Sequence, residues 1–168
     1  FATTRTTFTE DNGTTHVTWN TEDAIGLFTK EQSNLIYKAL SAGNNTKFEA
    51  TGERLKAIEG ETVYAYYPYS YGAENQPIVK LPNSISQFYQ ESASKLDFIY
   101  ASSNIISSKL SLQFKHAFAF LKITIPLELI ADRGKNGGLL IYSSEEISCD
   151  SYFDLEKEEI TSNKSNVI

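Results

Sequence analysis

Histidine is the side chain most often used for proton transfer near neutral pH, and this sequence contains only two, His16 and His116. Neither lies near residues that could complete a metal-binding or catalytic set, and His116 stands among phenylalanines. No Gly-x-Ser-x-Gly pattern, which would expose a nucleophilic serine on a sharp turn, occurs in the chain. We therefore interpret His116 as a hydrogen-bonded histidine of the core or of a strand edge.

Carboxylates occur mainly as neighbours in the chain: Glu22-Asp23, Glu145-Glu146 and Glu158-Glu159. Adjacent residues of a strand point to opposite faces, so such pairs cannot act together as an acid and a base. Residues 150–154 lack the alternating oxygen ligands and closing glutamate of a calcium loop, and no glycine-rich phosphate loop is present. These carboxylates are typical of solvated turns.

The single cysteine, Cys149, allows no disulfide within the chain and no cysteine-based metal site. Free cysteine is usually buried, so we interpret Cys149 as an apolar filler in a strand. Taken with the carboxylates and histidines, this predicts a protein without catalytic residues, cofactor or metal, and hence not an enzyme.

A cluster of tyrosines is the remaining candidate for binding, and it leaves two interpretations open. Tyrosine rings often pack at the ends of sheets with the hydroxyl in water. Alternatively, the rings form a binding face for a sugar or a protein partner. The candidate surface consists of Tyr64, Tyr66, Tyr69 and Tyr71.

Composition and charge narrow the class of protein. The chain of 168 residues has 15 basic and 21 acidic side chains, so its net charge of -6 disfavours binding to nucleic acid or to an anionic membrane. The longest apolar run, at 117–121, is far too short to cross a bilayer. No signal peptide is visible at the start, Phe1-Ala2-Thr3, so we expect a processed or trimmed product.

Ten phenylalanines and ten tyrosines, with no methionine, favour strands over helices. Turn signals such as Asp11-Asn12-Gly13 separate short apolar runs, and Pro68 should end one of them. The pattern predicts an all-β fold, an antiparallel Greek-key β-sandwich. The expected strands are a hairpin over 3–19, then 24–28, 35–40, 46–50, 62–67, 78–81, 97–101, 110–114, 114–125, 139–142, 147–149, and a final hairpin of 152–155 with 160–161.

Three segments of the sequence predict features other than regular strands. Gly26 interrupts an apolar run, which indicates a bulge or a close approach of another group to the backbone. Residues 114–125 are apolar on both faces, so this strand is either covered on both sides or switches its inward face at a bulge. Residues 69–95 are predicted to form a long loop that crosses one end of the fold.

Several ordered segments together resemble the fimbrillin-like proteins, which are type V pilins and related surface lipoproteins of Gram-negative anaerobes. The segments are Arg5-Thr6-Thr7-Phe8, Thr18-Trp19-Asn20, Asp23-Ala24-Ile25-Gly26-Leu27-Phe28, Gly60-Glu61-Thr62-Val63-Tyr64-Ala65-Tyr66-Tyr67-Pro68-Tyr69, Asp97-Phe98-Ile99-Tyr100-Ala101 and Leu112-Gln113-Phe114-Lys115-His116-Ala117-Phe118-Ala119-Phe120-Leu121. No single motif is specific, but their order covers nearly the whole chain.

The resemblance implies a transthyretin-like sandwich over residues 1–168, equivalent to the N-terminal domain of a two-domain pilin whose second domain is absent from this chain. It also implies an exported lipoprotein of the outer membrane and cell surface, with the lipidated cysteine before Phe1. The implied partners are other pilin subunits or the chain itself, with a host surface protein or glycan as further candidates.

The resemblance further implies assembly by strand exchange, in which a protease specific for arginine removes a first strand and a strand from another subunit takes its place. The candidate displaced strand and processing site consists of Thr3, Thr4, Arg5, Thr6, Thr7 and Phe8. Arg5 lies within this strand rather than in the loop after it, so a tip or anchor subunit is an alternative to a stalk pilin.

Three functions therefore stay open from the sequence. The first is a structural subunit or adhesin of a fimbria. The second is a surface glycan-binding domain of an outer-membrane lipoprotein, suggested by the tyrosines and by the loop at 69–95. The third is an enzyme or inhibitor with an unrecognised site.

Overall fold

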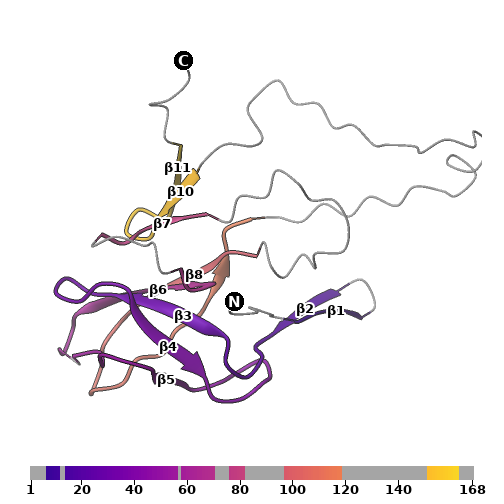
Figure 1. The fold of residues 1–168 in the computed structure, drawn as a ribbon, viewed down its shortest axis with the longest axis horizontal. Helices are drawn as coiled ribbons and strands as arrows, with labels where there is room; N and C mark the ends of the chain where they lie inside the picture. The colour runs from indigo at the N-terminus through magenta and orange to yellow at the C-terminus, as the bar shows by residue number, and fades with distance from the viewer. Residues whose placement is uncertain are drawn as a thin grey trace, which may run out of the picture.

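The computed structural model describes residues 7–11, 14–56, 58–70, 76–81, 97–118 and 151–162, and within these ranges every regular element is a β-strand (Figure 1). In the same ranges, no helix is long and apolar enough to span a bilayer. The strands are β1 (Thr7–Asp11), β2 (Thr14–Thr18), β3 (Ala24–Phe28), β4 (Leu35–Ala39), β5 (Phe48–Ala50), β6 (Thr62–Tyr67), β7 (Ile78–Lys80), β8 (Ile99–Asn104), β9 (Lys115–His116), β10 (Ser151–Asp154) and β11 (Glu159–Ser162).

The larger sheet has six strands in the order β5-β4-β3-β6-β8-β9, and neighbouring strands are antiparallel. Strands β3, β4 and β5 follow one another as hairpins, and β6 then returns to pair with β3 on its other side. A fourth strand that returns beside the first of three is the defining connection of a Greek key. The predicted antiparallel Greek-key fold is therefore confirmed.

A smaller sheet, in the order β11-β10-β7, packs over one face of the six-stranded sheet (Figure 1). The two sheets meet through aromatic side chains, with the rings of Phe98 and Phe153 5.4 Å apart and those of Tyr100 and Phe153 4.5 Å apart. This inter-sheet core gives the molecule its two layers. It consists of Phe28, Tyr66, Val79, Leu81, Phe98, Phe153 and Leu155.

The opposite face of the six-stranded sheet carries a second apolar cluster, which we name the groove-side core. Successive residues of a strand alternate between faces, so β3 contributes Ile25 and Leu27 to this cluster and Phe28 to the inter-sheet core. All five residues of β3 are buried as a result. The groove-side core consists of Ile25, Leu27, Leu35, Val63, Ala65, Tyr67, Ile99, Ala101 and Ile105.

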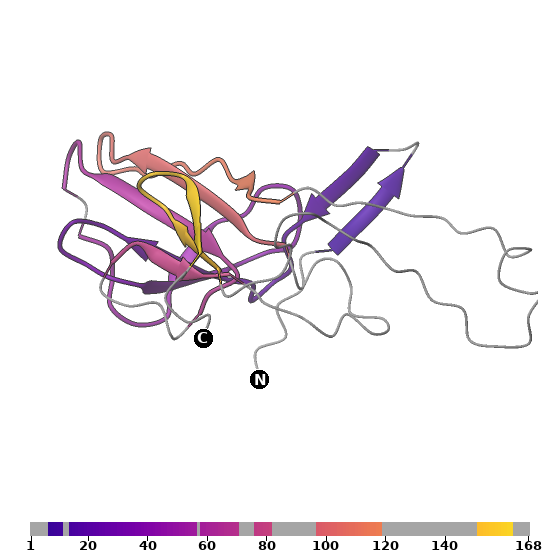
Figure 2. The same ribbon diagram turned by 90° about the horizontal axis from the view of Figure 1, so that it is seen from above.

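Strands β1 and β2 form a hairpin that stands away from both sheets (Figure 2). Their register pairs Phe8 with Val17, and neither strand pairs with any other described strand. Just after the hairpin the chain joins the sandwich, where Trp19 and Gly43 exchange two backbone hydrogen bonds of 2.9 and 3.0 Å. The predicted N-terminal hairpin is confirmed, and it forms an arm beside the sandwich.

The other predicted strands agree with the structure in most of the described ranges. Strands β3 and β6 have the predicted bounds, β6 ends before Pro68, and β10 and β11 form the predicted final hairpin. The predicted strand at 97–101 is shifted, because β8 begins at Ile99 and continues to Asn104. Residues 71–75 and 82–95 of the predicted loop, residues 119–125 of the predicted strand at 114–125, and the predicted strands at 139–142 and 147–149 lie outside the described residues, and so does Cys149.

The prediction of a strand at 110–114 is wrong. This segment follows β8 and leads into β9, but only Lys115 and His116 pair with β8. A strand requires ladder hydrogen bonds as well as an alternating pattern, and residues 110–114 have only the pattern.

Candidate functional site

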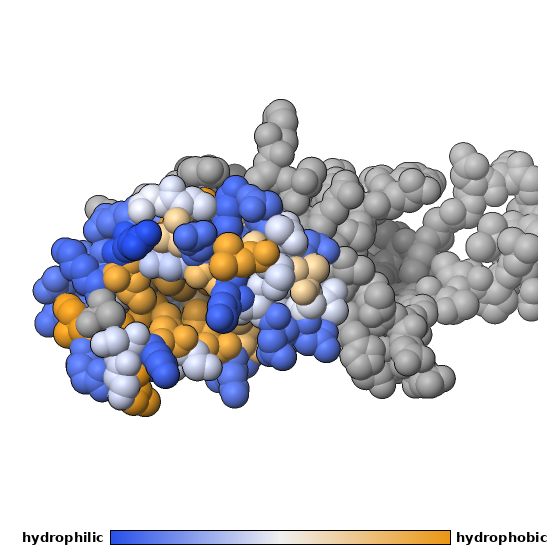
Figure 3. Space-filling model, turned by 90° about the horizontal axis from the view of Figure 1, so that it is seen from below, coloured by the Kyte–Doolittle hydropathy of each residue, from blue (hydrophilic) through white to orange (hydrophobic). Residues whose placement is uncertain are grey.

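The described surface has a groove of about 700 Å³ on the groove-side core. Its floor is formed by Ile25, Leu27 and Ile99 from the central strands of the six-stranded sheet. Figure 3 shows the molecule from this side, with a hydrophobic hollow surrounded by hydrophilic residues. A concave site of this size, with an apolar floor and polar groups around it, is a usual form of a binding site in proteins.

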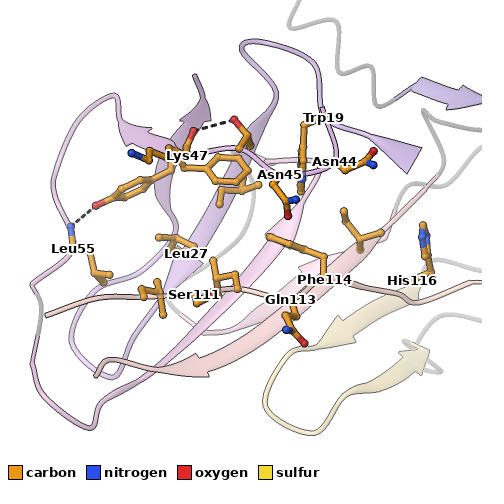
Figure 4. Close-up of a pocket in the computed structure, with 17 residues that line it drawn as sticks. Trp19, Leu27, Asn44, Asn45, Lys47, Leu55, Ser111, Gln113, Phe114 and His116 are labelled. Atoms are coloured by element: carbon orange, nitrogen blue, oxygen red, sulfur yellow. Dashed lines mark hydrogen bonds between the residues drawn. The ribbon is translucent and has the colours of Figure 1, made fainter. Parts of the chain in front are cut away.

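One end of the groove is built around Trp19, the only tryptophan of the chain (Figure 4). Its indole makes edge-to-face contacts with Phe48, Tyr67 and Phe114, at centroid distances of 5.1, 5.3 and 5.2 Å. Aromatic pairs of this geometry contribute about 0.5–1.5 kcal/mol beyond the burial of their area. Trp19, Phe48 and Phe114 therefore pack tightly against one another and form what we name the aromatic wall of the groove.

A second wall is formed by the segment 110–114, which runs along the groove (Figure 4). Leu110, Leu112 and Phe114 are half-buried and pack against the groove-side core, whereas Ser111 and Gln113 are exposed. The backbone of this segment makes no hydrogen bond with another described residue. This wall therefore combines an apolar side with a backbone that pairs with no other part of the described chain.

Charge is distributed unevenly around the groove. Lys47 and His116 line it, and no described aspartate or glutamate does. The Nδ1 atom of His116 lies 2.8 Å from Oδ1 of Asp97, which is fully buried behind it. Burial raises the pKa of the Asp97 carboxyl above its usual value, and the hydrogen bond and charge of His116 partly offset this effect. The interpretation of His116 as a hydrogen-bonded edge histidine agrees with this geometry.

The fold does not place the described tyrosines of the candidate surface beside the groove. Tyr66 is fully buried, so its prediction as a surface residue is wrong. Its ring lies in the inter-sheet core, because alternation along β6 turns it away from Val63, Ala65 and Tyr67. Tyr64 and Tyr69 are half-buried against the same core, and Tyr71 lies outside the described residues.

The hydroxyl of Tyr66 is held by a local hydrogen-bond network. It donates to Oδ1 of Asn34 at 2.7 Å and accepts from the backbone N–H of Ser70 at 3.1 Å. Burial, the largest effect, raises the pKa of Tyr66, while the bonds to Ser70 and Asn34 lower it. Asn34 in turn donates to the backbone carbonyl of Ser70 at 2.9 Å, so one tyrosine ties three chain segments together.

We expect Tyr66→Phe to lower the free energy of unfolding by about 1–2 kcal/mol, since the buried partners of its hydroxyl lose a hydrogen bond. Urea unfolding measures this change. Tyr64→Phe is the matched control, because Tyr64 lies on the same strand and its hydroxyl bonds to no other described residue. Equal effects of the two substitutions would contradict the assignment of the network to Tyr66.

The candidate displaced strand is described only at its end. Thr7 and Phe8 belong to β1 and pair with Thr18 and Val17 of β2, whereas Thr3, Thr4, Arg5 and Thr6 lie outside the described residues. The role of this strand in assembly therefore stays a prediction. Within the described ranges, no three histidine, cysteine, aspartate or glutamate side chains gather as a metal ion would require.

The sequence reasoning did not find the groove itself. Trp19, Leu27, Phe48 and Leu112 come from four separate segments, which the pairing of β3, β4, β5, β6 and β8 in one sheet brings together. The available signal was the alternation of Leu110, Leu112 and Phe114, which we interpreted as an ordinary strand.

The sequence was compared with profiles of known protein families and with curated proteins. A sequence profile described as fimbrillin-like matches residues 4–167. Comparison with curated proteins gives no match.

Two solved structures of Bacteroides proteins are similar to part of this chain. The first is a proposed cell adhesion protein from Bacteroides uniformis ATCC 8492, with 19% identity, 59% of this chain and 43% of that chain covered, and a TM-score of 0.49. The second is a proposed cell adhesion protein from Bacteroides ovatus ATCC 8483, with 20% identity, 62% of this chain and 46% of that chain covered, and a TM-score of 0.43. The aligned part of this chain thus corresponds to less than half the length of either structure.

Proposed function

Because the chain belongs to the fimbrillin-like family, we propose that it is a structural subunit or adhesin of a cell-surface fimbria and acts through protein–protein contacts. The family match over residues 4–167 carries this proposal. The groove supports it, since an exposed apolar hollow in a soluble domain usually marks a surface that another molecule covers.

We propose that assembly occurs by exchange of a β-strand between subunits. An exposed sheet surface with unpaired backbone groups is satisfied by an added strand, which supplies both hydrogen bonds and apolar side chains. The groove-side core and segment 110–114, whose backbone bonds to no other described residue, offer these two features together. In this proposal the residues Thr3 to Phe8 form the strand that is displaced, with Arg5 as the processing site.

The proposed cellular setting follows from the same family. The protein would be exported as a lipoprotein to the outer membrane, and residues 1–168 would form one sandwich domain that works beside a second domain. Its partners would be other pilin subunits or further copies of itself. A host surface protein or glycan would be the ligand if the subunit sits at the tip.

Electron microscopy of the purified native subunit, with and without an arginine-specific protease, tests assembly. We expect filaments to appear after cleavage, and we expect Leu112→Asp to abolish them because a carboxylate would enter the apolar groove. Ile106→Asp is the matched control, since Ile106 is 67% exposed and does not line the groove. Filaments of normal length from the Leu112→Asp protein would contradict the proposed use of the groove.

The alternative function is binding of a glycan by the tyrosine surface. One of the four tyrosines proposed for that surface, Tyr66, is buried and cannot contact a glycan. A glycan array probed with the purified protein tests what remains of it. Binding of a defined glycan that is lost in Tyr64→Ala or Tyr69→Ala would favour this alternative over the fimbrial subunit.

A further inference from the structure

The loop between β5 and β6 carries an arginine that is exposed to solvent, Arg54. The chain has three arginines, and the other two, Arg5 and Arg133, lie outside the described residues. Exposed loops without regular structure are preferred sites of proteolytic cutting. Exposure alone would therefore make the Arg54–Leu55 bond a second target for the arginine-specific protease proposed to act at Arg5.

Both polar groups of the Arg54–Leu55 peptide bond are held by side chains from the hairpin of β3 and β4. The backbone carbonyl of Arg54 accepts a hydrogen bond of 2.9 Å from Nε2 of Gln32. The backbone N–H of Leu55 donates to the hydroxyl of Tyr37 on β4 at 2.8 Å, the bond drawn dashed beside Leu55 in Figure 4. We name Gln32 and Tyr37 the loop clamp.

The side chain of Gln32 is buried and bonded at both ends of its amide. Besides the bond to Arg54, its Nε2 donates to Oε1 of Glu53 at 2.8 Å, and its Oε1 accepts from the backbone N–H of Lys56 at 2.7 Å. The turn after β3 fixes Gln32 itself, because its backbone N–H donates to Oγ1 of Thr29 at 3.0 Å. Opening the loop would leave these buried polar groups without partners, which makes the closed loop the stable form.

Proteolysis of this bond needs the carbonyl oxygen that the clamp occupies. A protease binds the scissile carbonyl oxygen with its own hydrogen-bond donors while water is added across the bond. Hydrolysis would leave a carboxylate on Arg54 and an amine on Leu55. In the folded domain Nε2 of Gln32 already bonds to that oxygen. Cleavage therefore requires the loop to open first, and its rate follows the population of the open form.

We propose that the loop clamp shields the Arg54–Leu55 bond, so that an arginine-specific protease processes the chain at Arg5 without cutting the domain at Arg54. Leu55 and Tyr37 both line the groove, so a cut at Arg54 would break the chain beside the groove. This inference rests on the proposed function, to which it adds the residues that restrict where the protease cuts.

Digestion of the purified native protein with an arginine-specific protease, followed by mass spectrometry, tests the proposal. The measured quantity is the initial rate at which Leu55 appears as a new amino terminus. We expect this rate to be at least about a hundredfold lower than in a synthetic peptide of residues 48–60, where the clamp is absent. Cleavage at Arg5 in the same digest should proceed without this protection.

Two variants remove the members of the clamp separately. Gln32→Leu should raise the rate at Arg54 at least about tenfold, because two backbone groups of the loop lose their bonds. Tyr37→Phe should raise it about two- to tenfold, because it frees only the N–H of Leu55.

A third variant separates opening of the loop from general loss of stability. Phe153→Leu weakens the inter-sheet core on the opposite face of the six-stranded sheet and touches no residue of the loop. The whole domain becomes less stable, but the loop keeps its clamp, so the rate at Arg54 should change by less than about twofold.

The proposal would be overturned if the native protein were cut at Arg54 as fast as the peptide, or if Gln32→Leu had no effect. Equal acceleration by Phe153→Leu and Gln32→Leu would overturn it as well, since cleavage would then follow unfolding of the whole domain. If Arg54 is shielded as expected but no cut at Arg5 and no filaments are found, the proposed assembly fails and the clamp stands. Filaments formed after a cut at Arg5, with rapid cutting at Arg54 in the native protein, give the opposite result.

Discussion

Gly26→Ala is expected to destabilise the protein by at least about 3 kcal/mol, at the upper end of the cost of an overpacked core. A Cβ atom at this position would overlap Cε1 of the Tyr66 ring and would lie 2.8 Å from Oδ1 of Asn34. For a chain of this size the expected fall in Tm is roughly 6–12 °C. Calorimetry or urea unfolding of the variant measures the change.

The clash cannot be relieved cheaply, because the Tyr66 ring is fixed on all sides. Gly26 and Tyr66 are directly opposite on β3 and β6, and the ring crosses the glycine to reach Asn34. The rings of Phe28, Tyr69 and Phe98 surround it at centroid distances of 6.0, 6.4 and 6.1 Å. Moving the ring would therefore break its hydrogen bonds or displace the inter-sheet core.

Gly52→Ala is the control for this prediction. Gly52 has an ordinary backbone conformation, and an added Cβ would meet nothing within 4 Å. Its substitution should change stability by less than about 0.5 kcal/mol. If Gly26→Ala were as mild as Gly52→Ala, the close packing of Tyr66 on the backbone of β3 would be wrong.

Gly26 also shows how far local sequence signals reach. A glycine inside an apolar run predicted a bulge or a close approach, and the close approach is confirmed by the ring of Tyr66. The bounds of β3 and β6 could be predicted because the apolar run at 24–28 lies between polar residues and because Pro68 cannot continue a ladder. These features depend on residues that are neighbours in the chain.

The features that the sequence did not predict depend on distant partners. Segment 110–114 has the alternation of a strand, yet whether it pairs is decided by β8, which pairs with Lys115 and His116 of β9 but with no residue of 110–114. The clustered tyrosines gave no indication of which ring is inside. Tyr66 is buried because the sheet of β7 and β10 covers that face of β6, and this pairing joins residues more than 70 positions apart.

The groove could not be predicted for the same reason. Its aromatic wall joins Trp19, Phe48 and Phe114, which are separated in the chain and meet through the Trp19–Gly43 bridge and the hairpin of β4 and β5. The family resemblance implied that a strand from another subunit takes the place of a removed one, but it did not indicate which residues would receive that strand. Composition alone could disfavour nucleic acid as a partner, because that expectation needs only the net charge.

His116→Ala is expected to lower the free energy of unfolding by about 2–3 kcal/mol at neutral pH, because it leaves the carboxylate of Asp97 buried without its hydrogen-bond donor. The control is Lys115→Ala on the same strand, whose exposed ion pair with Glu158 at 3.3 Å should contribute less than about 1 kcal/mol. Urea unfolding of both variants compares the two interactions.

The loss of unfolding free energy caused by His116→Ala should increase with pH. Burial raises the folded-state pKa of Asp97, so the folded protein holds this proton more tightly than the unfolded chain does. The contribution of Asp97 to stability is therefore greatest below its unfolded pKa of about 3.9 and falls as pH rises through the raised folded pKa. Since His116 opposes this rise in the pKa, its removal should extend the loss to higher pH.

The stability gap between wild type and His116→Ala should accordingly be smallest below the ordinary aspartate pKa of about 3.9, and should widen as the pH rises through the raised folded-state pKa of Asp97. Asp97→Asn removes the titrating group, so His116→Ala added to that variant should cost less than it does alone and should show no widening. A gap of equal size below and above that pKa would mean that His116 supports the strand end by packing alone. In that case the interaction between His116 and the buried carboxylate of Asp97 would not contribute to the stability of the strand end.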